Sequence, residues 1–222
     1  MNRSIFSKYR SGALAIALAL AAFPVSQQAH AHPHEFVTMD MTARFDSNKH
    51  MSGMTYVWTF DEFFSAYAIE GQDKNKNQKA EPEELTALLV EIIGNIKDIK
   101  YFTVFDKEHV VPEFAPARPI SSKMVDGKLR IEFVVPFAKP LDLRGKKLRY
   151  AIYADEFYIA MNYDPENEGI NITGAADRCS SGIDRPDPDE EIVAFASSLG
   201  KEQSSGGGLG AQFAEWVTLS CK

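Results

Sequence analysis

The stretch EFVTMDMTARF, from Glu35 to Phe45, carries apolar side chains at its odd positions from Val37 onward and mainly polar ones at its even positions. A period of two is typical of a β-strand with one buried and one solvated face. A turn-like Asp-Ser-Asn-Lys sequence follows, and the alternation resumes between Met54 and Phe60. The two stretches therefore predict a β-hairpin that contributes its apolar face to a core.

The chain beyond this hairpin carries the patterns of both helices and strands. Asp61 is placed to cap a short helix that ends near Ile69. The clearest helix is predicted over 81–96, because Pro82 and neighbouring acids suit a first turn and apolar residues recur at helical spacing. A second main helix is expected over 186–199. Further strands are expected at 101–105, 128–137, 147–154, 157–163 and 216–221.

These elements predict an α+β fold, with an antiparallel, sandwich-like sheet and two main helices packed against it. The chain has 222 residues and is 45% apolar, which is enough for a packed core. We expect residues 32–222 to form a single globular domain. A division into two small subdomains near 100–125 is the alternative.

The first 31 residues are predicted to be a secretory signal peptide. Basic residues precede a short apolar run, and Ala29 and Ala31 supply the small side chains that a signal peptidase reads. A membrane anchor is the alternative, but a span takes about 20 apolar residues and Pro24 closes this run early. Cleavage would remove three of the 24 basic residues and none of the 31 acidic ones. We therefore expect an acidic periplasmic protein that neither binds nucleic acid nor keeps a membrane segment.

Cys179 and Cys221 are the only cysteines, so one intramolecular disulfide is possible. An exported protein meets an oxidising compartment, which favours this bond. In the chain-entropy model a closed loop of about 42 residues stabilises the fold by about 4 kcal/mol. Two free thiols that bind a metal are the alternative.

Cleavage after Ala31 would make His32 the new amino terminus, followed by Pro33 and His34. The amine and ring Nδ1 of a terminal histidine close a six-membered chelate, and a metal can displace the amine proton near neutral pH. Pro33 has no amide proton, which blocks square-planar binding through ionised amides. Imidazole ligands favour Zn, Ni, Co or Cu over Mg or Ca.

His32 and His34 are therefore the predicted metal ligands. His50 and His109 are candidates to complete the site, although each also suits a surface turn. The alternative for the terminus is a frayed segment whose histidines bind nothing.

Residues 73–84 match the spacing of a calcium-binding EF-hand loop. Gln78 stands where the motif has the glycine of its sharp turn, and two of the five side-chain ligands are neutral amides beside lysines. The sequence predicts that the loop keeps its shape and binds Ca²⁺ weakly. The oxygen-bearing positions are Asp73, Asn75, Asn77, Glu81 and Glu84.

Six segments of the chain together resemble the periplasmic domain-of-unknown-function family number 1007, often labelled the periplasmic component of an ABC-type transport system. The family loop usually carries glycine, so Gln78 is a departure. The resemblance implies an accessory role in divalent-metal transport, often beside nickel/cobalt-type permeases, and carries metal binding over to His32 and His34 only. The matching segments are His32–Phe36, Trp58–Phe64, Asp73–Glu84, Asp155–Ala160, Arg185–Pro188 and Leu209–Thr218.

The leading interpretation is a non-enzymatic periplasmic protein that binds Zn, Ni, Co or Cu and delivers it to a membrane permease or ABC-type transporter. A copper-dependent redox enzyme that uses the same terminal chelate is one alternative. A structural or interaction domain of the envelope without metal is the other. The sequence contains no phosphate-binding loop, nucleophile elbow or HExxH helix.

Overall fold

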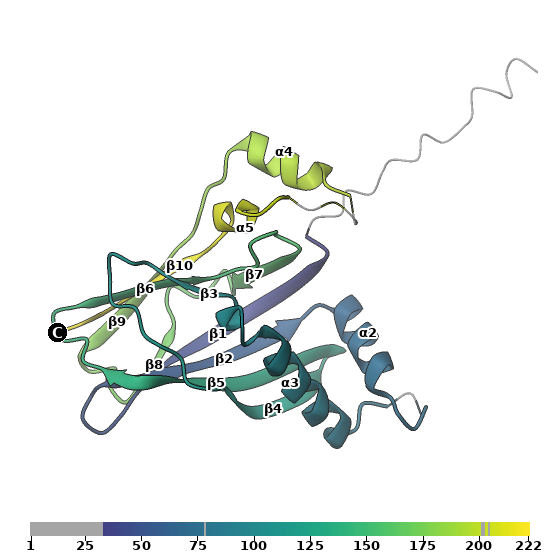
Figure 1. The fold of residues 1–222 in the computed structure, drawn as a ribbon, viewed down its shortest axis with the longest axis horizontal. Helices are drawn as coiled ribbons and strands as arrows, with labels where there is room; N and C mark the ends of the chain where they lie inside the picture. The colour runs from purple at the N-terminus through teal and green to yellow at the C-terminus, as the bar shows by residue number, and fades with distance from the viewer. Residues whose placement is uncertain (1–32, 78, 201–202, 204) are drawn as a thin grey trace, which may run out of the picture. The chain divides into compact units, whose positions relative to one another are not determined.

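The predicted hairpin forms the centre of the larger of two sheets (Figure 1). The computed structural model describes residues 33–77, 79–200, 203 and 205–222, so the predicted signal peptide and His32 lie outside the described residues. β1 (Glu35–Phe45) pairs antiparallel with β2 (Met51–Phe60). The odd-numbered residues of β1 from Val37 to Ala43 are buried, as the alternation predicts.

Four further strands extend the larger sheet, whose order is β4–β5–β2–β1–β7, with β8 also paired to β1. β5 runs antiparallel to β2 and β4, whereas β7 and β8 run parallel to β1. The bounds are β4 (Arg118–Val125), β5 (Lys128–Leu141), β7 (Ile159–Tyr163) and β8 (Asn171–Thr173).

The smaller sheet is antiparallel throughout, in the order β3–β6–β10–β9. Cys179 and Cys221 lie opposite each other in the β9–β10 ladder and form a disulfide, which confirms the predicted pairing. The bounds are β3 (Thr103–Phe105), β6 (Lys147–Ile152), β9 (Cys179–Asp184) and β10 (Trp216–Cys221).

The first helix, α2 (Glu62–Gln72), begins where the sequence predicts. The Oδ1 atom of Asp61 accepts the backbone N–H of Phe64 at 2.9 Å and caps the helix. The buried hydroxyl of Ser65 then ties α2 to the sheet, because it accepts the backbone N–H of Leu129 in β5 at 2.8 Å.

α3 (Pro82–Ile96) packs against β4 and buries Leu85, Leu88, Leu89 and Ile93. A 3-10 turn, η1 (Lys100–Phe102), connects it to β3. The connection between β9 and β10 holds two more helices, α4 (Glu190–Ser198) and α5 (Leu209–Gln212).

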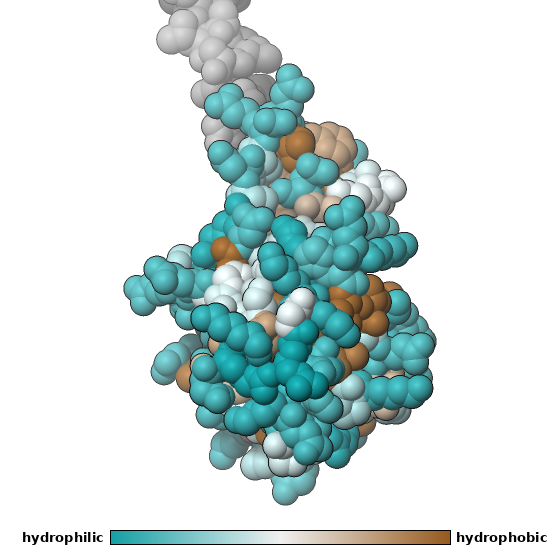
Figure 2. Space-filling model, turned by 90° about the vertical axis from the view of Figure 1, so that its left-hand side faces the viewer, coloured by the Kyte–Doolittle hydropathy of each residue, from teal (hydrophilic) through white to brown (hydrophobic). Residues whose placement is uncertain are grey.

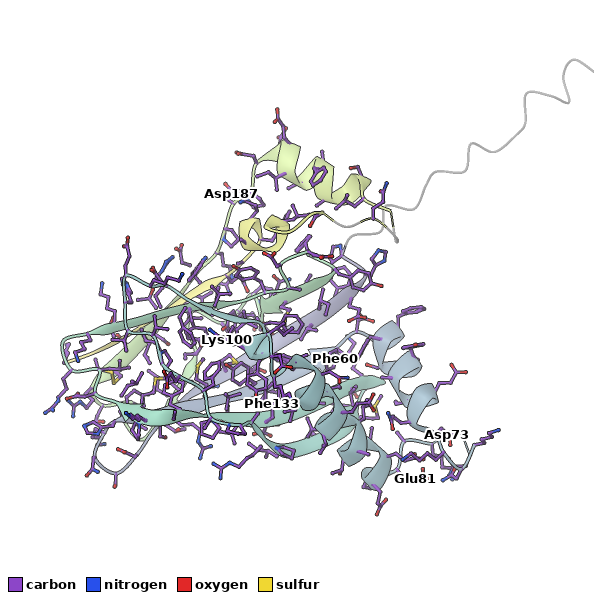
Figure 3. All side chains as sticks on the ribbon, viewed as in Figure 1. Phe60, Asp73, Glu81, Lys100, Phe133 and Asp187 are labelled. Carbon is purple, nitrogen blue, oxygen red and sulfur yellow. A yellow bond between two sulfur atoms is a disulfide. The ribbon has the colours of Figure 1, made fainter. Side chains whose placement is uncertain are left out.

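The main core brings together the inner faces of both sheets and the buried face of α3, and Phe60 and Phe133 lie within it (Figure 3). A second, smaller apolar cluster joins α4 to α5 through Ala196, Leu199 and Leu209. The α+β prediction with an antiparallel-dominated sheet is confirmed. No helix within the described residues is long and apolar enough to cross a membrane.

Candidate functional site

His34 lies directly before β1 and is held there by the segment that leads into β7. Its backbone N–H donates to the carbonyl oxygen of Tyr158 at 2.9 Å, and the centroids of the two rings lie 4.8 Å apart. The Nε2 atom is shielded from solvent. His34 is therefore a positioned side chain, and His32, two residues earlier, lies outside the described part of the chain.

Asp61 fixes the other side of this region. The backbone N–H of Phe36 donates to its Oδ2 atom at 2.8 Å, while the N–H of Asp61 donates back to the carbonyl oxygen of Phe36 at 2.9 Å. Since Oδ1 caps α2, both carboxylate oxygens already accept hydrogen bonds. Glu62, the next residue, is exposed.

These residues line a shallow depression of about 440 Å³ at the start of β1. Its lining combines one imidazole, the carboxylates of Asp61 and Glu62, the aromatic rings of Phe36 and Phe63, and the amine of Lys128. Imidazole with carboxylate is a donor set that suits Zn, Ni, Co or Cu. Among the described residues, no group of three or more His, Cys, Asp or Glu side chains is placed to hold a metal ion.

Glu35 faces the opposite side of the strand from Phe36. It lines an inner cavity together with Val37, the next inward-facing residue of β1. Burial first, and the negative charge of Asp61 second, raise the pKa of Glu35. The sequence reasoning missed Glu35 as a site residue, although the odd positions of β1 predict that it points inward like Val37 and Met39.

The structure places His50 and His109 away from His34. His50 closes the β1–β2 turn, where its N–H donates to Asp46 at 2.9 Å. The 11 residues of β1 separate that turn from His34, or roughly 35 Å at the usual strand rise. His109 lies in a turn beside Lys147, where β6 begins. The end of the molecule that holds the β1–β2 turn presents a mainly hydrophilic surface (Figure 2).

The EF-hand-like residues are brought together by the loop between α2 and α3, where Figure 3 shows Asp73 and Glu81. The N–H of Asn77 donates to Oδ1 of Asp73 at 3.1 Å and to Oδ1 of Asn75 at 3.0 Å. The side-chain amides of both asparagines donate to the carboxylate of Glu81, whose pKa falls mainly through the bond from Asn77. Glu84 accepts the N–H of Lys74 at 3.1 Å.

The oxygen-bearing side chains therefore accept hydrogen bonds from within the loop, and two side-chain amides donate to the carboxylate of Glu81. Gln78, which the sequence identifies as the departure from the motif, lies outside the described residues.

Two comparisons bear on what the protein is. A protein of Haemophilus influenzae described as an uncharacterized protein is 30% identical over 195 residues, which cover 86% of this chain and 92% of that protein. The family model described as a protein of unknown function, DUF1007, matches residues 15–221. The match spans the described fold from β1 to β10 and includes His34, the loop 73–84 and both cysteines. The chain therefore belongs to the DUF1007 family.

Proposed function

We propose that this protein is a periplasmic accessory protein that binds a divalent transition metal, Zn, Ni, Co or Cu, and passes it to a membrane permease or ABC-type transporter. His32 would contribute its amine and its imidazole after cleavage, and His34 a second imidazole. The observation that carries the proposal is the fixed position of His34 in a depression that Asp61 and Glu62 also line. Two residues of chain span at most about 7 Å, so His32 can reach the same metal as His34.

The electrostatics of the depression favour a cation. Asp61 and Glu62 contribute negative charge there, and Lys128 is the one basic side chain among the described lining residues. Since both oxygens of Asp61 already accept backbone N–H groups, the exposed carboxylate of Glu62 is the better candidate for a direct ligand. Three nitrogen donors and one carboxylate would complete a four-coordinate site.

Isothermal calorimetry with Zn²⁺, Ni²⁺, Co²⁺ and Cu²⁺ tests the chelate. A protein that begins at His32 should bind one of these ions, and one extra glycine before His32 should weaken binding about tenfold or more, or ~1.4 kcal/mol. The extra residue turns the amine into an amide, which is not a ligand at neutral pH. Equal affinities for the two proteins would refute the chelate.

Matched histidine variants separate the site from general effects on metal binding. His34→Ala should weaken binding, whereas His50→Ala and His109→Ala should not, because neither side chain is near His34. Amino-terminal sequencing of protein from a periplasmic extract tests export and cleavage. Growth of cells that carry His34→Ala under metal limitation tests the link to transport.

A further inference from the structure

A small cavity opens on the inner side of β1, across the strand from the depression that His34 lines. Its volume is about 190 Å³. That volume corresponds to roughly six water molecules at ~30 Å³ each, and it is too small for a drug-sized ligand. Four aromatic side chains wall it: Trp58 and Phe60 from β2, Phe64 from α2 and Phe102 from η1. Aliphatic side chains of β1, α3 and β7 complete the lining.

The four rings pack against one another at different angles. The planes of Trp58 and Phe60 are 81° apart, and those of Trp58 and Phe102 are 46° apart. Phe64 stacks on Phe60 with centroids 4.5 Å apart. All four rings line the cavity, and the face of an aromatic ring attracts a cation through its negative quadrupole.

Glu35 is the one charged side chain among the described residues that line the cavity, and Asn95 is the one amide. Lysine and arginine do not contribute to that described lining, so nothing basic in it neutralises the carboxylate. A neutral apolar ligand would leave the negative charge of Glu35 without a counter-charge. A small organic cation would pair with the carboxylate and also contact the rings.

The backbone that presents Phe102 is strained. Lys100, Tyr101 and Phe102 have φ values of 54°, 55° and 59°, so three consecutive residues with side chains adopt the left-handed region. Figure 3 labels Lys100, where this turn begins. Strain of this kind persists where the surrounding structure enforces it, and it concentrates at binding sites. Phe102, the last residue of this turn, lines the cavity.

We propose that this cavity binds a small organic cation of the quaternary-ammonium class, with its charge between the aromatic rings and Glu35. The site goes beyond the proposed metal function, because it uses neither His32 nor His34. It gives the protein a second ligand on the opposite face of the same strand.

Fluorescence titration with choline tests the proposal. The chain has two tryptophans, so Trp216→Phe leaves Trp58, which lines the cavity, as the only tryptophan, and excitation at the red edge of its absorption avoids tyrosine emission. In the presence of EDTA, choline should change the emission of Trp58 saturably. Its uncharged isostere, 3,3-dimethylbutan-1-ol, should bind about tenfold more weakly because it lacks the cation.

Two variants locate the binding. Glu35→Gln and Phe102→Leu should each weaken choline binding about tenfold and weaken binding of the uncharged isostere much less, because they remove a charge or a ring face that attracts a cation. Glu70→Gln is the matched control, since Glu70 is exposed on α2 and lines neither the cavity nor the depression. Circular dichroism and the melting temperature establish that each variant is folded.

Equal affinity for choline and its isostere would overturn the proposal in favour of a cavity for an uncharged apolar group. Absence of a saturable change with choline would overturn it as well. Because no metal is present, neither result bears on the chelate at His32.

Discussion

His34 and Glu35 are neighbours in the sequence, yet each lines a different hollow. Successive side chains of extended chain point to opposite faces, so a shift by one residue would exchange them. The ladders of β1 with β2 and β7 set this register, and two contacts at the start of β1 support it: the N–H of His34 donates to Tyr158, and the N–H of Phe36 donates to Asp61. Both proposed ligands therefore depend on the same few hydrogen bonds at the start of β1.

Glu35 also gives the fold a pH dependence. Because its pKa is raised above the usual 4.5, the folded protein binds more protons than the unfolded chain between that value and the raised pKa. The free energy of unfolding therefore falls as the pH rises through this interval. Glu35→Gln removes the effect, so we expect the variant to melt above the wild type near pH 7 and together with it near pH 3.5.

The measurement is a pair of melting curves at each pH, with EDTA present. Glu70→Gln changes the net charge by the same amount at an exposed position on α2 and should leave the melting temperature unchanged at both pH values. A Glu35→Gln variant that is less stable than the wild type near pH 7 would show that the carboxylate stabilises the fold.

At the scale of elements, the loop between α2 and α3 holds its oxygen-bearing side chains together through its own hydrogen bonds. Gln78 occupies the position where a calcium-binding loop has glycine. Gln78→Gly should raise the affinity for Ca²⁺ about tenfold over a weak starting value, because glycine is the residue that the motif uses for its sharp turn. Calorimetry with Ca²⁺ measures the change, and Gln78→Ala is the control. Equal affinities for the glycine and alanine variants would place the defect in the neutral ligands Asn75 and Asn77.

The elements that the sequence predicted are those whose own residues show a period. The hairpin and α3 each bury one face, and their apolar spacing shows it. β4, β8 and β9 were missed, because they lie at sheet edges and are short or bury too few apolar side chains to show a period. Their pairing is set by strands distant in the sequence, and local spacing does not record it.

The candidate site also has parts that the sequence could predict and parts that it could not. His34 and the cap at Asp61 could be read from the sequence because each follows from local chemistry. The cavity could not, since Phe102 and Trp58 come together only when η1 packs against β2. The alternation in β1 does place Glu35, a charged residue, at an inward-facing position. Only the structure shows that a cavity lies at this position.

At the scale of the molecule, the disulfide closes the long connection that holds α4 and α5. Cys179 and Cys221 are 42 residues apart. Replacing both with serine should lower the free energy of unfolding by about 3–4 kcal/mol, because the unfolded chain regains the freedom of that loop. Guanidinium denaturation measures the loss, and wild type with reductant should match the variant. An unchanged midpoint would show that the β9–β10 ladder holds the ends together without the bond.

The two sheets are joined by Glu215, a buried carboxylate directly before β10 in the smaller sheet. Its Oε2 atom accepts the N–H of Tyr163 at the end of β7 in the larger sheet, at 2.6 Å. Its Oε1 atom lies 2.9 Å from Nε of Arg185, directly after β9. The Nη2 atom of Arg185 donates in turn to the carbonyl oxygens of Asp164 and Asn167, so one carboxylate connects three segments.

Glu215→Gln keeps the shape of this side chain and removes its charge. We expect it to lower the free energy of unfolding by about 2–3 kcal/mol, because hydrogen bonds to a charged group are lost while Arg185 keeps its charge. Guanidinium denaturation provides the value. Asp142→Asn, in the exposed pair with Arg144, should leave the midpoint unchanged, since solvent screens that pair. Equal effects of the two substitutions would mean that backbone pairing and apolar packing alone join the sheets at this point.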